Sequence, residues 1–239
     1  VSSQHVLCML DNFLIFAEKP LKGRTIVHFA LDPASQDYCE QRSANVSSRL
    51  LCHNLTGWVP NAGENLKSSA MDNSGFGSCI YKMMIWTRPV LLLHAARVAK
   101  HGILSLDDDL MLSKGNDGSI LDWIEKHGDP SKKMIAGSEW GFLPNGGTIF
   151  VNHGSTDLIQ EWIGAARRVN EDSGDQAGLH AVLLENQEYW LPLIQIIDTQ
   201  TLGQGAVEGE YGTHFDAVSD KISTLKERHM WRTQAPHCQ

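Results

Sequence analysis

Three consecutive carboxylates, Asp107-Asp108-Asp109, are the residues of this sequence best suited to chemistry. They follow the short apolar segment Ile103–Leu106, which the pattern predicts to be a buried strand. Adjacent carboxylates repel one another unless a cation neutralises them. Mg²⁺ and Mn²⁺ prefer such oxygen ligands, and they often take one or two carboxylates together with substrate phosphates. The triplet therefore predicts a divalent-cation site at the end of a strand. The alternative interpretation is a solvated acidic loop.

Two more candidates follow a glycine-rich segment, residues 203–212, near the carboxyl end of the chain. His214 and Lys221 lie where a flexible backbone could fold back around a diphosphate, with Lys221 acting as a point charge. The alternative is that His214, one of eleven histidines, is an ordinary loop residue.

Two short polar motifs have equally balanced interpretations. Asp175-Gln176 opens a predicted helix, where an aspartate either caps the helix or serves a site. In Asn145-Gly146-Gly147 the glycines allow a ligand to approach the backbone closely, although a plain turn would also use them. Among the seven tryptophans, Trp58 and Trp140 lie in predicted loops, so they are the candidates for stacking on a sugar or a base.

Apolar periodicity places these residues in an α/β domain that spans residues 1–239. Predicted helices alternate with predicted strands, which favours a mostly parallel central sheet flanked by helices on both faces. Ligands of such sheets gather at the carboxyl ends of the strands. The predicted helices are Val6–Ala17, Tyr81–Arg88, Pro89–Lys100, Ser119–His127, Ser155–Val169, Asp175–Leu184 and Lys221–His229. The predicted strands are Thr25–Leu31, Ile103–Leu106, Lys133–Gly137, Thr148–Asn152 and Leu191–Ile197.

Residues 43–76 are rich in Asn, Ser and Gly, and they are predicted to form a long irregular loop. Long loops in compact domains are often lids or binding loops, so we expect this one near the mouth of the active site.

Charge and composition exclude several classes of protein. The net charge is −8 and no basic run is present, which argues against a nucleic-acid binder. Such an acidic chain needs a bound cation wherever it holds an anionic ligand. No apolar stretch is long enough to cross a bilayer. The motifs of serine hydrolases, P-loop nucleotidases, dinucleotide-binding folds and HExxH metalloproteases do not occur.

The cellular compartment stays open at this level. The sequence begins at Val1, so we expect a fragment or processed segment whose upstream anchor, if any, is not seen. Its five cysteines have no CxxC spacing, which disfavours structural zinc. The glycosylation tripeptides at Asn45 and Asn54 lie near Cys39 and Cys52. Either they occur by chance in a cytoplasmic protein, or the chain resides in the Golgi lumen and Cys39 and Cys52 could be bridged.

Taken in order, these segments resemble the nucleotide-diphospho-sugar transferase family that includes plant and algal cell-wall arabinosyl- and xylosyltransferases. No single motif decides the resemblance, which rests on the ordered set over nearly the whole chain. The matching segments are Phe29–Asp32, His101–Leu110, Gly146–Asn152, Asp175-Gln176, Leu202–Gly205, His214, Lys221 and Trp231.

The resemblance implies a GT-A fold in which a DxD motif holds Mn²⁺ or Mg²⁺ on the diphosphate of a nucleotide sugar. Asp107 and Asp109 would form that motif, with Asp107 near the nucleotide and Asp109 on the metal. His214 would contact the metal or the diphosphate. The implied function is transfer of a sugar from a UDP- or GDP-sugar to a glycan or glycoconjugate acceptor, with retention of configuration.

The remaining implied contacts concern the donor. Lys221, Gly146, Gly147 and Asp32 match donor-binding positions, and the catalytic positions near the donor sugar match Asp175 and Gln176. Arg88 departs from the pattern, since relatives often have a lysine there, and it would substitute for that lysine in binding the donor.

Two other functions remain open. A sugar-phosphate nucleotidyltransferase can have a similar sheet, but such enzymes usually carry a glycine-rich, basic loop that residues 1–24 lack. A non-catalytic module that binds sugar nucleotides is the other alternative.

Overall fold

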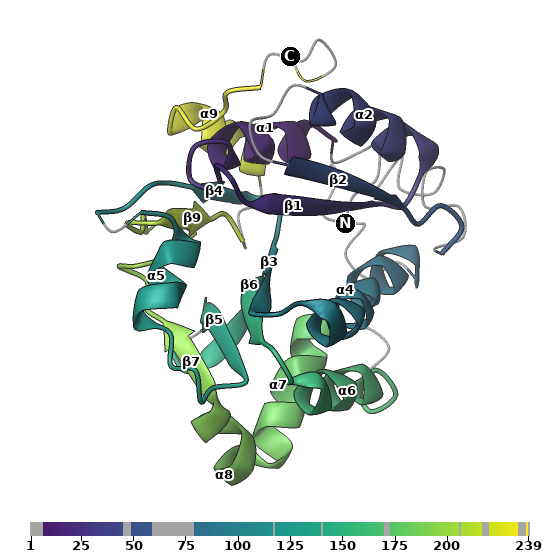
Figure 1. The fold of residues 1–239 in the computed structure, drawn as a ribbon, viewed down its shortest axis with the longest axis vertical. Helices are drawn as coiled ribbons and strands as arrows, with labels where there is room; N and C mark the ends of the chain where they lie inside the picture. Colours follow the sequence, from purple (N-terminus) through teal and green to yellow (C-terminus); the bar gives the residue numbers. More distant parts are fainter. Residues whose placement is uncertain are drawn as a thin grey trace.

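A computed structural model shows how the chain arranges three β-sheets and the helices around them (Figure 1). It describes residues 7–44, 49–58, 79–116, 118–139, 141–169, 173–205, 207–216, 220–233 and 238. The helices are α1 (Leu7–Ala17), α2 (Pro33–Ser43), α4 (Cys79–Val98), α5 (Ile120–His127), α6 (Thr156–Ala165), α7 (Asp175–Glu185), α8 (Gln187–Trp190), α9 (Lys221–Glu227) and the 3₁₀ helix η3 (Leu191–Leu193). The strands are β1 (Thr25–Ala30), β2 (Arg49–Asn54), β3 (Gly102–Leu106), β4 (Leu110–Leu112), β5 (Met134–Glu139), β6 (Leu143–Asn152), β7 (Ile194–Ile197), β8 (Gly203–Gln204) and β9 (Gly212–His214).

The α/β class is confirmed, but the strands form mixed sheets rather than a mostly parallel one. The four-stranded sheet has the order β3-β6-β5-β7, with β6 antiparallel to both of its neighbours and β7 parallel to β5. A parallel pair, β1-β2, and a three-stranded sheet, β4-β9-β8, make up the rest. Strand β6 follows β5 after a short turn, and such a connection makes two neighbouring strands antiparallel.

Helices cover the four-stranded sheet on both faces, as its apolar strands require. In Figure 1 α4, α6 and α7 lie on one side of this sheet and α5 lies on the other. Of the ten residues of β6, eight are buried, which marks a strand covered on both faces. Trp162 of α6 and Leu179 of α7 are fully buried in the core on the α4 side. Helix α5 packs Ile120 and Ile124 into the second core, which it shares with α1. The result is a rigid sheet whose strand ends can hold a site.

Three sequence predictions needed correction. Helix α2 was not predicted, although Asp32 caps it and Pro33 takes its first turn, a recognised start signal. The two helices predicted to meet at Pro89 form the single helix α4 with Pro89 inside. The predicted loop 43–76 contains strand β2, whose apolar residues Leu50, Leu51 and Cys52 are consecutive, and it pairs in parallel with β1. Residues 45–48 and 59–76 of this predicted loop lie outside the described residues.

Helix α1 contacts both α2 and the carboxyl-terminal segment of the chain. Asp11 is 4% exposed, and its carboxylate contacts the hydroxyls of Tyr38 and Thr233 and lies 3.0 Å from Arg42 Nε. A disulfide between Cys8 and Cys238 adds a covalent tie. A second disulfide joins Cys39 of α2 to Cys52 of β2, so the bridge left open by the sequence is present.

None of the described helices combines the length and apolarity that a membrane span needs.

Candidate active site at the ends of β3, β6 and β9

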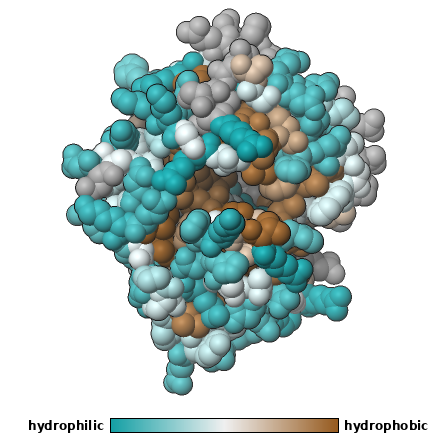
Figure 2. Space-filling model, viewed as in Figure 1, coloured by the Kyte–Doolittle hydropathy of each residue, from teal (hydrophilic) through white to brown (hydrophobic). Residues whose placement is uncertain are grey.

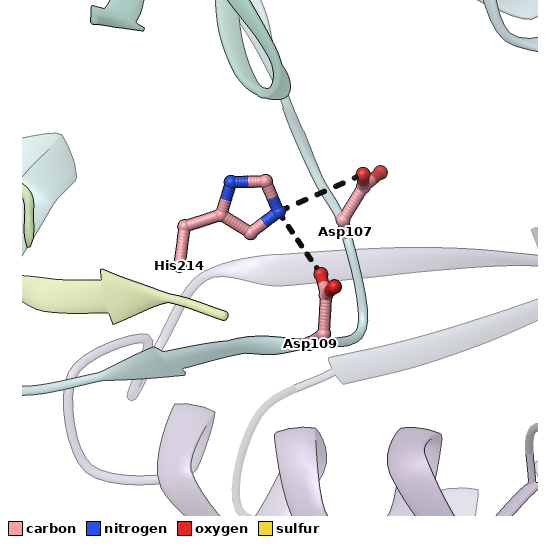
Figure 3. A group of neighbouring side chains, drawn as sticks. All are labelled: Asp107, Asp109 and His214. Atoms are coloured by element: carbon pink, nitrogen blue, oxygen red, sulfur yellow. Dashed lines mark hydrogen bonds and ion pairs between the residues drawn. The ribbon is translucent and has the colours of Figure 1, made fainter. Parts of the chain in front are cut away.

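Two neighbouring carboxylates, Asp107 and Asp109, meet the imidazole of His214, which lies 105 residues after Asp109 in the chain (Figure 3). His214 Nε2 lies 3.1 Å from Asp109 Oδ1 and 4.0 Å from Asp107 Oδ2. One potential ligand atom from each residue lies within 4.8 Å of the other two. Asp109 and His214 are both buried, at 6% exposed each, so the point is held inside the protein rather than on a solvated loop.

Strand pairing explains why these residues meet. Asp107 follows β3, and its backbone N–H donates to Gly147 O of β6 at 2.9 Å. The chain then turns into β4, whose first residue Leu110 pairs with His214 of β9. Phe215 N donates to Asp109 O at 3.1 Å, which closes the ladder beside the site. A residue that the sequence placed on a flexible glycine-rich tail is therefore fixed by a β-ladder.

The electrostatics of the cluster favour charged forms of both partners. Burial acts to raise the pKa of Asp109, but hydrogen bonds and charges from His214 and Lys221 outweigh it and hold the pKa below its ordinary value. Burial acts to lower the pKa of His214, yet the hydrogen bond and charge of Asp109 raise it overall. Lys221 Nζ contacts Asp109 Oδ2 directly. The Asp109 carboxylate is thus held ionised by the hydrogen bond of His214 and the charge of Lys221.

Arg88 of α4 gathers the other side of the site. Its guanidinium lies 2.9 Å from Asp107 Oδ1 and 3.3 Å from Asp175 Oδ2, and it also donates to Gly146 O. A planar fork of five donors is suited to hold several acceptors at once, which a lysine could not do in the same geometry. Arg88 therefore fixes Asp107, α7 and Gly146 of β6 relative to one another.

Asp175 and Gln176 lie beside the glycine pair Gly146-Gly147. Gly174 is the N-cap of α7, and Asp175 is its first residue: Asp175 Oδ1 accepts from Gln176 N at 3.0 Å, while Oδ2 faces Arg88. Asp175 is 5% exposed, and burial raises its pKa although Arg88 opposes the shift. Gln176 Oε1 accepts from Gly146 N at 2.6 Å. Both residues thus contact elements that also hold Asp107.

Gly146 and Gly147 belong to strand β6 rather than to a turn, and protein side chains approach both of them closely. A Cβ on Gly147 would lie 2.1 Å from His214 Cε1, and one on Gly146 would lie 2.9 Å from Arg88 Nη1. The close approach is therefore between this part of β6 and protein side chains. Any further approach of a ligand to these glycines remains a prediction.

A carboxylate–amide network behind His214 was not singled out from the sequence. The side-chain nitrogens of Asn145 and Gln204 each donate to both Glu139 Oε2 and Asp216 Oδ2, at 2.6 to 3.0 Å. Asn145 Oδ1 accepts from Gly147 N at 2.8 Å, and Asp216 Oδ2 lies 3.9 Å from His214 Nδ1. These residues stand in or next to the motifs around Gly146 and His214, but only the fold shows that they interlock.

Asp32 and Asp108 are placed differently from the residues above. The carboxylate of Asp32 accepts from the backbone and hydroxyl of Ser35 as the cap of α2. Asp108 is half-buried, and burial together with the charges of Asp109 and Asp107 raises its pKa to about 7.

A cavity of about 1150 Å³ opens beside the site, between β1 and β3. Figure 2 shows it as a hollow with hydrophobic residues in its floor. Asp107, Asp108 and Arg88 contribute to its wall, and Phe29 and Trp58 add aromatic surface. Trp58 is 51% exposed, so its ring is accessible as the sequence predicted for a stacking residue. Trp140, the other stacking candidate, lies outside the described residues.

The ligand atoms of Asp107, Asp109 and His214 fit a divalent cation. Metal–ligand bonds in proteins are about 2.0–2.2 Å long, so two ligands of one ion are about 3–4 Å apart, close to the separations found here. Two carboxylates and one imidazole are ligands that Mn²⁺ accepts.

Comparison with solved structures identifies the architecture. Mouse xyloside xylosyltransferase 1 superposes with a TM-score of 0.58 at 12% identity, covering 89% of this chain and 93% of that one. The galactosyltransferase LgtC, solved with donor and acceptor sugar analogues, also gives 0.58 at 12% identity, with 96% and 93% coverage. The glycosyltransferase GlyE of Streptococcus pneumoniae TIGR4 gives 0.55 at 16% identity.

The chain has a GT-A glycosyltransferase-like fold. The match to GlyE covers 98% of this chain and 51% of GlyE, so this chain spans only about half the length of that protein. No protein-family model matches the sequence, and no curated protein matches it either. Within the GT-A fold the Asp107–Asp109–His214 cluster lies at the carboxyl end of β3, where the sequence predicted a cation site.

Proposed function

We propose that this chain is a glycosyltransferase domain that moves a sugar from a UDP- or GDP-linked donor to a glycan or glycoconjugate acceptor, and that it needs Mn²⁺ or Mg²⁺. The observation that carries the proposal is the convergence of Asp107, Asp109 and His214 at one point of a GT-A fold. Solved relatives of this fold include a xylosyltransferase and a galactosyltransferase with bound donor and acceptor analogues.

The shape of the site suits a nucleotide sugar. The nucleoside would lie in the cavity between β1 and β3, where Phe29 and Trp58 supply aromatic surface. Its diphosphate would then reach Asp107 at the cavity wall, within range of Arg88 and Lys221. Asp32, at the end of the same β1, is proposed to contact the nucleotide, although its present partner is Ser35.

Residues of this chain would hold the reactants in place. Asp107, Asp109 and His214 would bind the cation, which when bound acts as a Lewis acid on the diphosphate leaving group. Lys221 would place a further positive charge where negative charge develops as the glycosidic bond breaks. Gly146, Gly147 and Arg88 would shape the floor of the donor site.

Asp175 and Gln176 are proposed to face the donor sugar from the start of α7. The buried Asp175 carboxylate is held by Arg88, so it can hydrogen-bond a sugar hydroxyl or the acceptor. A retaining reaction is proposed from the family resemblance. The two disulfides favour an oxidising compartment such as the Golgi lumen over the cytoplasm.

The test is a thermal-shift screen of nucleotide sugars with Mn²⁺ or with EDTA. A donor at a hundredfold excess over its Kd stabilises the fold by about 2.7 kcal/mol, which raises Tm by roughly 5–10 °C in a protein of this size. We expect this shift only with metal. Equal stabilisation in EDTA would exclude a metal-bridged diphosphate.

Variants of the proposed ligands sharpen the test. Asp109→Asn and His214→Ala should each abolish metal-dependent donor hydrolysis, and the double variant should lose no more than the worse single one, since ligands of one ion act as a unit. Asp37→Asn, on the exposed face of α2, removes the same charge and should behave as wild type. Formation of a nucleoside triphosphate from donor and pyrophosphate would instead indicate a nucleotidyltransferase.

A further inference from the structure

The turn after β2 carries the tripeptide Asn54-Leu55-Thr56, a pattern that accepts N-linked glycans when its side chains reach solvent. Asn54 and Thr56 are both exposed, whereas Leu55 between them is 9% exposed and packs in a small core with Leu31 and Leu91. Asn54 and Thr56, the two residues that an oligosaccharide-transferring enzyme recognises, are therefore accessible, while Leu55 holds the backbone between them in place.

Hydrogen bonds fix the tripeptide in a tight turn. Leu55 N donates to Ala30 O at 2.8 Å, which extends the β1-β2 pairing, and Trp58 N donates to Leu55 O at 3.0 Å. Thr56 N donates to Asn54 Oδ1 at 2.8 Å. This bond orients the carboxamide by its oxygen. Its nitrogen, the atom to which a glycan is attached, has no hydrogen-bond partner that we observe within the described residues.

The cysteines give independent support. Cys52, two residues before Asn54, is bridged to Cys39, and a second bridge joins Cys8 to Cys238. Disulfides of this kind form and persist in the lumen of the secretory pathway and are rare in the cytosol. N-linked glycans are added to the chain in that same lumen. Disulfide formation and glycosylation of Asn54 would therefore both take place in the lumen of the secretory pathway.

We propose that Asn54 is N-glycosylated. The donor is an oligosaccharide joined through a diphosphate to a membrane lipid, and a host enzyme catalyses the transfer. The Asn54 amide nitrogen forms a bond to the anomeric carbon while the bond from that carbon to the diphosphate oxygen breaks. The amide loses one proton, and the lipid diphosphate leaves with the electron pair.

The position of the glycan has a structural consequence. His53 and Leu55 contribute to the wall of the cavity beside Asp107, whereas Asn54 and Thr56 do not. Alternation along a strand places neighbouring side chains on opposite faces, so the glycan projects away from the cavity. It also stands at the end of β2, whose outer edge is unpaired in the described sheets. A bulky glycan there would hinder edge-to-edge association.

Peptide mass spectrometry tests the proposal on the complete natural gene expressed in a eukaryotic host. Digestion with a peptide N-glycosidase in heavy-oxygen water should convert Asn54 into an isotopically labelled aspartate. Asn54→Gln and Thr56→Ala should each lose one glycan, and Thr56→Ser should keep it. Asn54→Gln should change donor Kd by no more than about twofold, the range of a neutral surface substitution.

The second tripeptide, at Asn45, lies outside the described residues. The variant Asn45→Gln distinguishes a glycan at that position from one at Asn54. Loss of label at Asn54 only in Asn54→Gln and Thr56→Ala supports the assignment. An unlabelled Asn54 peptide from wild-type protein whose disulfides have formed overturns it. This readout is independent of sugar transfer, so the glycan and the proposed enzymatic function can fail separately.

Discussion

Substituting Gly147 by alanine should disable the cation site without unfolding the protein. An ideal Cβ at this position would lie 2.1 Å from Cε1, 2.4 Å from Nε2 and 2.8 Å from Nδ1 of His214. The backbone φ of Gly147 is not in the left-handed region, so alanine introduces no backbone strain there. The imidazole is therefore the group that must move.

The size of the movement follows from these distances. Ordinary contacts of a Cβ begin at 3.4 Å, so the ring must move away by about 1.3 Å. A metal–nitrogen bond is only about 2.1 Å long, and a shift of about half that length removes the ligand. Second-shell disturbances alone cost roughly 10–100-fold in metal affinity, so we expect at least that loss. Overpacking costs about 1–3 kcal/mol, which lowers Tm by roughly 2–12 °C in a protein of this size.

The assay is Mn²⁺ titration by calorimetry together with metal-dependent donor hydrolysis. Gly164→Ala is the matched control, because a Cβ on this helix α6 residue meets nothing within 4 Å. It should leave metal affinity unchanged and raise stability by about 0.5–1 kcal/mol. Wild-type Mn²⁺ affinity in Gly147→Ala would refute the placement of His214 on the ion.

Three further predictions concern groups around the site. Asn145→Asp places a third carboxylate against Glu139 and Asp216, and urea unfolding should show a loss of about 1–3 kcal/mol. Burial lowers the pKa of His28 from 6.5 to about 3, so the unfolded chain takes up the proton first and stability falls as pH drops below 6.5. Between pH 6.5 and 5 the loss should be about 2 kcal/mol, and a flat profile in wild type, or an equal slope in His28→Phe, would contradict this. Arg88→Lys should lower kcat/KM at least about tenfold, because an ammonium cannot hold two carboxylates and a carbonyl in one plane, and steady-state kinetics with a donor checks this.

Local patterns were enough for most helices and for the strand that ends at Asp107. A short apolar run before an acidic triplet predicts a strand end whatever the rest of the chain does, and β3 lies where it was expected, although its residues are half-buried beside the cavity rather than buried as predicted. Helix α2 escaped because its sequence has few apolar residues, although Asp32 and Pro33 carried the start signal. The direction of the strands was not predicted correctly either, because the apolar pattern of a strand does not show which neighbour it pairs with.

The sequence by itself determined the chemistry available to this protein: carboxylates at a strand end, an imidazole, and an acidic surface that disfavours anions without a cation. Only the tertiary structure decided which of these groups meet. Asp109 and His214 are brought together because β4 pairs with β9, and the Asn145 side chain of β6 links Gly147 to Asp216, two residues after β9. Such contacts join segments 71 to 105 residues apart, and no local periodicity encodes the choice of partner.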